Sequence, residues 1–197
     1  MGLVYGVGVN DYDGSISVGG KHNYDYVCWK GILRRCFSEE FHRNRPTYKD
    51  CAISDEFLSF DCFREFIVEQ KGFNCTDDQG RRFALDKDLL SPNNKIYARD
   101  TICFLPVEIN SLLTLRQNYR GACLVGVKLT PSGKYAAQIS KHGKRFTLGH
   151  YSTEIEAFQA YKVEKEAYVK EIAEKWKGKI DARAYNALME YQVEKDA

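Results

Sequence analysis

The chain has 197 residues, of which 44% are hydrophobic and 28% charged, and its formal net charge is +2. This length accommodates one or two small domains, and this hydrophobic content is ordinary for a globular protein. No apolar run approaches membrane-spanning length, and the N-terminus lacks the basic and apolar regions of a signal peptide. The composition therefore argues against a membrane partner, and we expect a soluble, cytoplasmic protein.

Residues 3–9 are expected to form a glycine-containing strand, and residues 24–37 are predicted to form a helix. The apolar residues of this helix recur at helical spacing: Tyr26, Trp29, Leu33 and Cys36. The polar segment 38–49 contains a proline and is expected to be a loop. A second, phenylalanine-rich helix is predicted to begin near Ser54 or Ser59.

A strong turn signal, Asp-Asp-Gln-Gly, occupies residues 77–80. Residues 83–90 then read as a strand, a return strand begins at Ile96, and a helix is expected over residues 106–115. These elements predict a β-hairpin followed by a helix, which would complete a first domain over residues 1–115.

The next segment is basic: seven Lys or Arg and no Asp or Glu occur from Arg116 to Thr153. Three short alternating strands are predicted, with turns at Ser132–Gly133 and His142–Gly143. Thr153 and Glu156 have capping-box spacing before a helix with small residues on one face. We predict a second domain over residues 116–176 and a short C-terminal helical tail over residues 177–197.

A small basic sheet on a helix is suited to a polyanion, because exposed Lys and Arg neutralise phosphates and release counterions. A sheet can also enter the major groove of DNA, where Gln pairs with adenine through two hydrogen bonds. The candidate DNA-binding residues are Lys128, Lys134, Gln138, Lys141, Lys144 and Arg145. The alternative is a solvated, lysine-rich surface with no ligand.

The spacing of Gly, Ala and aromatic residues from Tyr119 to about Lys170 resembles the AP2/ERF DNA-binding domain. That resemblance implies a three-stranded antiparallel sheet on one helix, whose open side reads the major groove. Lys128 and Arg145 match family positions that hold Arg, and Gln138 matches one that often holds Glu. Other family Arg or Trp positions are replaced here by Val125, Thr130, Ser132, Ser140 and Thr147.

Residues 85–110 resemble the ββα-metal core of phage HNH endonucleases. In that family a His activates water, while an Asp or Asn and a helical His or Asn hold Mg²⁺ or another divalent cation. Asp86 and Asn110 match the metal-binding positions, and Asp88 could bind metal or act as the base. Lys87 stands where the family has its catalytic His, and a protonated lysine is a poor base.

Asp86, Lys87, Asp88 and Asn110 are thus the candidate catalytic residues, and Asp86, Asp88 and Asn110 the candidate metal ligands. Asp86 and Asp88 would face the same side of one strand. The alternative for both carboxylates is turn and salt-bridge chemistry. The chain has seven cysteines without a C-x-x-C pair, which are expected to be buried, reduced thiols such as Cys62. The alternative is a metal site assembled from distant cysteines and His22 or His42.

We therefore predict an α+β protein with an HNH-like first domain and an AP2-like second domain. The wider resemblance, to HNH endonucleases with an AP2 domain, implies a phage origin and the host cytoplasm as location. The leading function is double-stranded DNA binding, with a nuclease-like domain that no longer cuts. The alternatives are an active homing-type endonuclease and a phage protein that binds a host defence protein.

Overall fold

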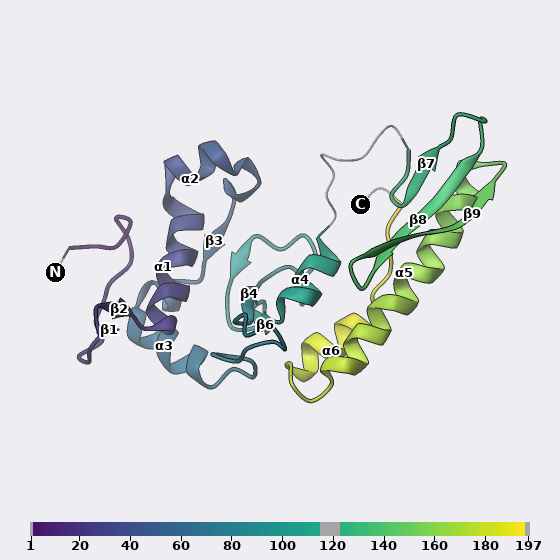
Figure 1. Cartoon of the computed structure of the whole chain (residues 1–197). Helices are drawn as coiled ribbons and strands as arrows, with labels where there is room; N and C mark the ends of the chain where they lie inside the picture. Colours follow the sequence, from purple (N-terminus) through teal and green to yellow (C-terminus); the bar gives the residue numbers. More distant parts are fainter. Residues whose placement is uncertain (1, 115–122, 196–197) are drawn as a thin grey trace. The chain divides into compact units, whose positions relative to one another are not determined.

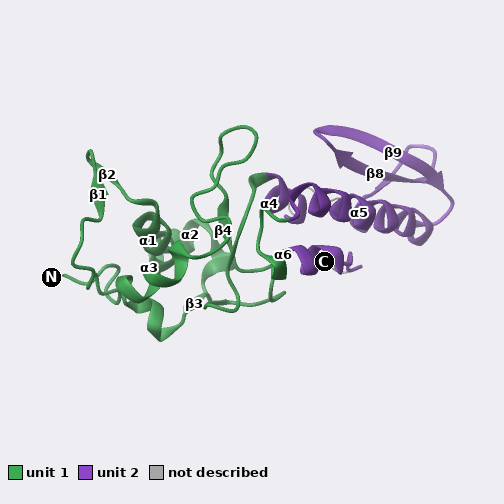
Figure 2. Cartoon of the chain, turned by 90° about the horizontal axis from the view of Figure 1, so that it is seen from below, with its two compact units in different colours: residues 1–107, 178–184 green, residues 108–177, 185–197 purple. Residues whose placement is uncertain are grey.

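The computed structural model describes residues 2–114 and 123–195 of an α+β chain. The chain divides into two compact units, shown in Figure 2. The first unit comprises residues 1–107 and 178–184, and the second comprises residues 108–177 and 185–197. The helix after Pro106, which we predicted in the first domain, thus belongs to the second unit from Glu108 onward.

The first unit is built from short strands and helices (Figure 1). In chain order they are β1 (Ser17–Val18), β2 (Lys21–His22), α1 (Tyr24–Phe37), α2 (Glu39–Asn44), the 3₁₀ helix η1 (Pro46–Tyr48), β3 (Ala52–Ile53), the 3₁₀ helix η2 (Asp55–Leu58), α3 (Phe60–Val68), β4 (Ala84–Asp86), β5 (Ile96–Tyr97) and β6 (Cys103–Leu105). The strands form three two-stranded sheets: antiparallel β1–β2, parallel β3–β5 and antiparallel β4–β6.

Aromatic side chains of α1 and α3 form the core of the first unit. Trp29 is fully buried, and its indole N–H donates to the carbonyl of Phe57 over 2.7 Å. The ring centroids of Trp29 and Phe60 lie 5.2 Å apart, and Phe63 packs edge-to-face on Phe57. The bounds of α1 and the burial of Tyr26, Trp29, Leu33 and Cys36 confirm the helical pattern predicted for residues 24–37.

Two further predictions for the N-terminal half are wrong, whereas the second predicted helix forms as α3, which begins after Ser59. Residues 3–9 do not form a strand, because Tyr5 and Gly6 adopt left-handed conformations that turn the chain between Val4 and Gly8. The segment 38–49 is not a loop but holds α2 and η1. Ser38 starts α2 by accepting the backbone N–H of Phe41 over 3.2 Å.

The hairpin forms with a different partner and a shorter first strand than predicted. β4 ends at Asp86 and pairs with β6, so that Asp86 lies opposite Cys103. The expected return strand at Ile96 instead pairs in parallel with Ala52–Ile53 as β5. Asp86 ends the strand because its carboxylate accepts the backbone N–H groups of Asp88 and Leu89, which bends the chain.

The second unit consists of one sheet, one long helix and smaller elements. They are α4 (Val107–Leu113), β7 (Val127–Leu129), β8 (Tyr135–Lys141), β9 (Lys144–Tyr151), α5 (Glu154–Trp176) and the C-terminal part of α6 (Ala182–Met189). The sheet is antiparallel with β8 in the centre, and α5 lies along one of its faces in Figures 1 and 2.

The local signals of this unit are confirmed. Thr153 and Glu156 form the capping box that starts α5. Gly133, His142 and Gly143 have positive φ, as the tight turns between strands require. The α5 residues on the predicted face are buried, with Ala160 partly so: Ala157, Tyr161, Tyr168 and Ile172 are at most 6% exposed.

All seven cysteines are free thiols. Burial raises the pKa of Cys28 to about 11 and that of Cys36 to about 12, as expected for small apolar side chains that do not react. Cys62 and Cys75 are exposed, so the expectation that Cys62 is buried beside its phenylalanine neighbours is wrong. None of the helices among the described residues has both the length and the apolar character needed to cross a bilayer.

Gly126 fixes how closely the chain before β7 approaches α5. Its φ is +75°, and a Cβ atom there would lie 2.1 Å from the ring of Tyr161. Gly133 has a similar φ of +78° but open space around it. We expect Gly126→Ala to lower the free energy of unfolding by about 2–4 kcal/mol through steric overlap and backbone strain.

Gly133→Ala is the matched control, because it adds the same strain without the overlap, and it should cost only about 1 kcal/mol. Urea denaturation of both variants measures the difference. Equal losses would show that Tyr161 moves aside freely and that the close approach does not stabilise the unit.

Candidate nucleic-acid interface

The register of the sheet assigns each side chain to one of two faces. Side chains alternate along a strand, and residues paired across strands share a face. Lys141 forms an ion pair with Glu164 of α5, so it points toward the helix. Tyr135, Ala137 and Ile139 alternate with Lys141 and therefore share the helix side, where Ala137 and Ile139 are buried.

The opposite side is defined by the residues that alternate with these in β8 and by their partners. It consists of Lys128, Ala136, Gln138, Ser140, Arg145, Thr147 and His150, which we call the open face. Within the described part of the second unit no helix lies over it (Figure 2). Gln138 and Thr147 stand opposite each other at its centre, with a long contact of 3.4 Å from the Gln138 amide to the Thr147 hydroxyl.

A β-bulge in β9 determines which residues reach the open face. Gln138 pairs with Thr147, whereas Ala137 pairs with Gly149, so Leu148 is the additional residue. In a regular strand Tyr151 would share a face with Thr147. The bulge turns Tyr151 toward the helix side, where its ring lies over Gly149, and puts His150 on the open face.

The structure distributes the six predicted DNA-binding residues over three locations. Lys128, Gln138 and Arg145 lie on the open face, and Lys128 and Arg145 are exposed. Lys134 and Lys144 are exposed beside the two turns. Lys141 is not on the open face, because its ammonium is held between Glu164 and the Tyr168 ring, 5.1 Å from the ring centroid.

His150 and Thr147 lie on the open face although neither is among the six candidate DNA-binding residues. Their positions depend on the bulge at Leu148, and simple alternation from Arg145 would have found Thr147 but not His150. The pairing of Ala136 with His150 could not be predicted from the sequence, because a bulge shifts the alternation of side chains along the strand by one residue.

Charges in the second unit are segregated by element. Residues 123–153, which carry the sheet, contain no Asp or Glu. Most carboxylates of the unit lie on α5, and several of these pair with lysines: Lys141 with Glu164, Lys162 with Glu166 and Lys177 with Glu174. No described carboxylate forms an ion pair with Lys128 or Arg145, so the open face keeps a positive potential.

The candidate carboxylates of the first unit have structural partners. Asp86 is half-buried, and its Oδ1 atom accepts the N–H groups of Asp88 over 3.0 Å and Leu89 over 2.8 Å. Burial raises the pKa of Asp86 above its usual range despite these hydrogen bonds. The carboxylate therefore closes a turn and does not project from a strand beside Asp88.

Lys87 is buried at 7% exposure and ties the loop after β4 together. Its ammonium donates to the carboxylate of Asp88 and, over 2.9 Å, to the carbonyl of Asn94. Asn94 in turn donates to the carbonyl of Ile96 over 2.6 Å. Lys87 thus holds the chain between β4 and β5, and Asp88 neutralises it.

These contacts do not fit a divalent metal. A cation at Asp86 and Asp88 would have to compete with the Lys87 ammonium and with two backbone N–H groups. Asn110 lies on α4. No group of three His, Cys, Asp or Glu that could hold a metal occurs in residues 2–114 and 123–195.

Comparison of the chain with models of protein families, with curated proteins and with solved structures finds no match.

Lys165 joins α5 to the helix that carries Asn110. Its side chain is buried, and its amine donates to the carbonyl of Leu112 over 2.7 Å at the C-terminal end of α4. Burial lowers the pKa of Lys165 from 10.5 to about 8. The folded protein therefore loses this proton at lower pH than the unfolded chain, and this group makes stability rise as the pH increases from 8 to 10.5.

We expect the stability of the native protein, relative to Lys165→Met, to increase by about 1–2 kcal/mol between pH 7.5 and pH 9.5. Urea denaturation of both proteins at the two pH values measures this difference and cancels the titration of other groups. A pH-independent difference would mean that Lys165 keeps its proton in the fold.

Proposed function

We propose that the chain binds double-stranded DNA through the open face of β7, β8 and β9. The observation that carries the proposal is the separation of the face into a cationic periphery and a neutral polar centre. Lys128 and Arg145 extend from the outer strands without carboxylate partners in the described chain, and Gln138 and Thr147 lie between them. This arrangement suits phosphates on both sides of a groove whose base edges meet the centre.

The dimensions of the sheet support the same ligand. Two or three antiparallel strands fit the major groove, and α5 braces the far side of the sheet so that it enters as a rigid body. The amide of Gln138 presents a donor and an acceptor, the pattern that matches adenine. Its 3.4 Å contact with Thr147 is long, so that the amide is free to turn toward a base.

In this proposal the first unit does not cut DNA. The ammonium of Lys87 donates a hydrogen bond to the carboxylate of Asp88, and the carboxylate of Asp86 closes a backbone turn. Neither carboxylate is therefore arranged to hold a metal ion with a bound water. The alternative of a metal-dependent endonuclease thus has less support than DNA binding. Recognition of a host defence protein has no specific support among the described residues and is an outcome of the binding test.

The binding test uses fluorescence anisotropy with a short labelled duplex at several salt concentrations. We expect the double variant Lys128→Ala/Arg145→Ala to lose affinity and to reduce the slope of log K against log salt by about two, one for each phosphate contact. Lys141→Ala is the matched control, since it removes a lysine from the helix side of the same sheet.

An unchanged affinity in the double variant, or an equal loss in Lys141→Ala, would overturn the proposed interface. Absence of duplex binding by the native chain in low salt would transfer support to a protein partner.

The cleavage test incubates supercoiled plasmid with the protein and either Mg²⁺ or Mn²⁺. We expect no nicking above a buffer control and no difference between the native chain and Asp88→Ala. Nicking that is lost in Asp88→Ala and in Asn110→Ala would show that the first unit is an active nuclease and that the contacts of Lys87 rearrange when metal binds.

A further inference from the structure

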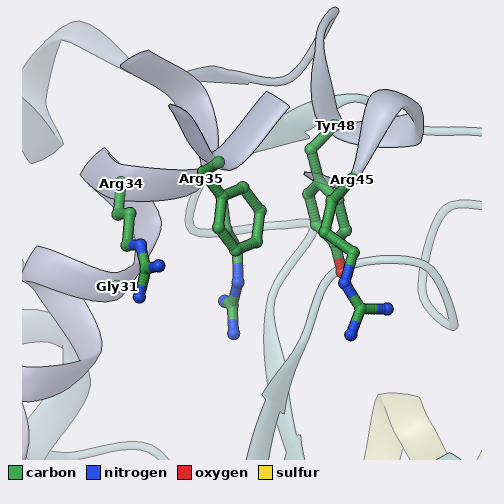
Figure 3. Close-up of a pocket in the computed structure, with 6 residues that line it drawn as sticks. Gly31, Arg34, Arg35, Arg45 and Tyr48 are labelled. Atoms are coloured by element: carbon green, nitrogen blue, oxygen red, sulfur yellow. The ribbon is translucent and has the colours of Figure 1, made fainter. Parts of the chain in front are cut away.

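A pocket of about 370 Å³ opens in the first unit at the corner between α1 and α2. The residues that line it are Gly31, Arg34, Arg35, Phe41, Arg45 and Tyr48. Figure 3 shows the side chains of Arg34, Arg35 and Arg45 extending in the same direction, with the Tyr48 hydroxyl on the same side. Three guanidinium groups and one phenol thus converge on one cavity.

Ser38 forms this corner because it is both the C-cap of α1 and the N-cap of α2. Its backbone N–H donates to the carbonyl of Arg34 and ends α1, and its hydroxyl accepts the N–H of Phe41 and starts α2. The chain therefore changes direction at Ser38, and α2 lies across the end of α1 (Figure 1). Tyr48 follows in η1, where its N–H donates to the carbonyl of Arg45.

Aromatic contacts hold the side chains that surround the pocket. The rings of Phe41 and Tyr48 pack edge-to-face with centroids 5.4 Å apart, and the Arg34 guanidinium lies 5.1 Å from the Phe41 ring centroid. His42 contacts the carbonyl of Arg35 over 2.7 Å, which braces α2 against α1. Packing thus fixes Phe41 and Tyr48 at the pocket, whereas Arg34 and Arg45 are exposed side chains.

The charges of the pocket have no carboxylate counterpart among the described residues. Four other described arginines of the first unit pair with carboxylates: Arg64 with Asp25, Arg81 with Asp77, Arg99 with Glu56 and Arg183 with Asp181. No described carboxylate lies within ion-pair distance of Arg34, Arg35 or Arg45. The helix dipole accounts for two cations in the last turn of α1, but Arg45 lies beyond the end of α2 and points into the same cavity.

We propose that this pocket binds a phosphate group. A planar guanidinium donates two parallel hydrogen bonds to a phosphate, and several of them together match its charge and its tetrahedral oxygens. The Tyr48 hydroxyl adds a neutral donor. The phosphate belongs either to a nucleic-acid backbone or to a small phosphorylated molecule, and the site does not require that the sheet of the second unit binds DNA.

The first experiment measures binding of pyrophosphate to the full-length chain by isothermal titration calorimetry, with chloride at matched ionic strength as reference. We expect Arg35→Ala/Arg45→Ala to weaken binding roughly tenfold or more, because each change removes charge-assisted hydrogen bonds. Arg43→Ala is the matched control: Arg43 is an exposed arginine of α2 that does not line the pocket, and its loss should leave the affinity unchanged.

Arg35→Lys/Arg45→Lys keeps both charges but removes the fork geometry, and it should bind with intermediate affinity. Far-UV circular dichroism checks that each variant folds. Failure of the native chain to bind pyrophosphate, or equal binding by Arg35→Ala/Arg45→Ala and Arg43→Ala, would overturn the proposal.

The source of the phosphate is resolved with a short duplex in the Lys128→Ala/Arg145→Ala background. Residual duplex binding that disappears when Arg35 and Arg45 are also replaced by Ala assigns the pocket to a nucleic-acid backbone. Pyrophosphate binding without such a change assigns it to a small molecule. Full duplex affinity of Lys128→Ala/Arg145→Ala would reject the sheet interface and leave the pocket assignment intact.

Discussion

The packing of α5 against β8 determines which side chains of the second unit remain free to meet a ligand. Ala137 and Ile139 are buried beneath the helix, and the closeness of this contact depends on small residues: Ala137, Ala157 and Gly126, which lies against Tyr161. Because alternation is strict along β8, burial of one set of residues leaves Gln138 and Ser140 on the other side. The helix therefore decides the composition of the open face, although it contributes no residue to it.

The same contact explains why acidic and basic residues are separated. Lys141 on the helix side meets Glu164 of α5 and is neutralised. Cations on the open face have no such neighbours among the described residues, so their charge is directed to solvent or to a polyanion. A net charge of +2 for the whole chain conceals this local field.

The two units present cations in different ways. In the second unit they are carried by a sheet, whereas in the first they converge on a pocket from the end of α1 and from Arg45, which follows α2. Lys87 is a third case, a buried cation that Asp88 neutralises and that organises the loop before β5. Only the partners of each side chain distinguish a ligand-binding cation from a structural one.

The sequence by itself determined the elements whose signals are local. Helical spacing predicted α1, and the capping box predicted the start of α5. The dipeptides Ser132–Gly133 and His142–Gly143 predicted the two turns of the sheet. It also determined that the segment of the three strands is basic and lacks carboxylates. These features depend on neighbours within a few residues, which the chain order already provides.

Only the tertiary structure decided the features that depend on distant residues. Periodicity does not reveal the bulge at Leu148, the pairing of β4 with β6, or the partner of Lys141 on α5. The sequence predicts that Asp86 and Asp88 lie on one face of a strand. In the structure the strand ends at Asp86, because its carboxylate accepts backbone N–H groups of the following turn. The arginine pocket needed the corner at Ser38, because the return of α2 to α1 is a property of the fold and not of spacing. Contacts between remote segments select among conformations that local propensities leave nearly equal in free energy, and that selection sets the final position of each functional side chain.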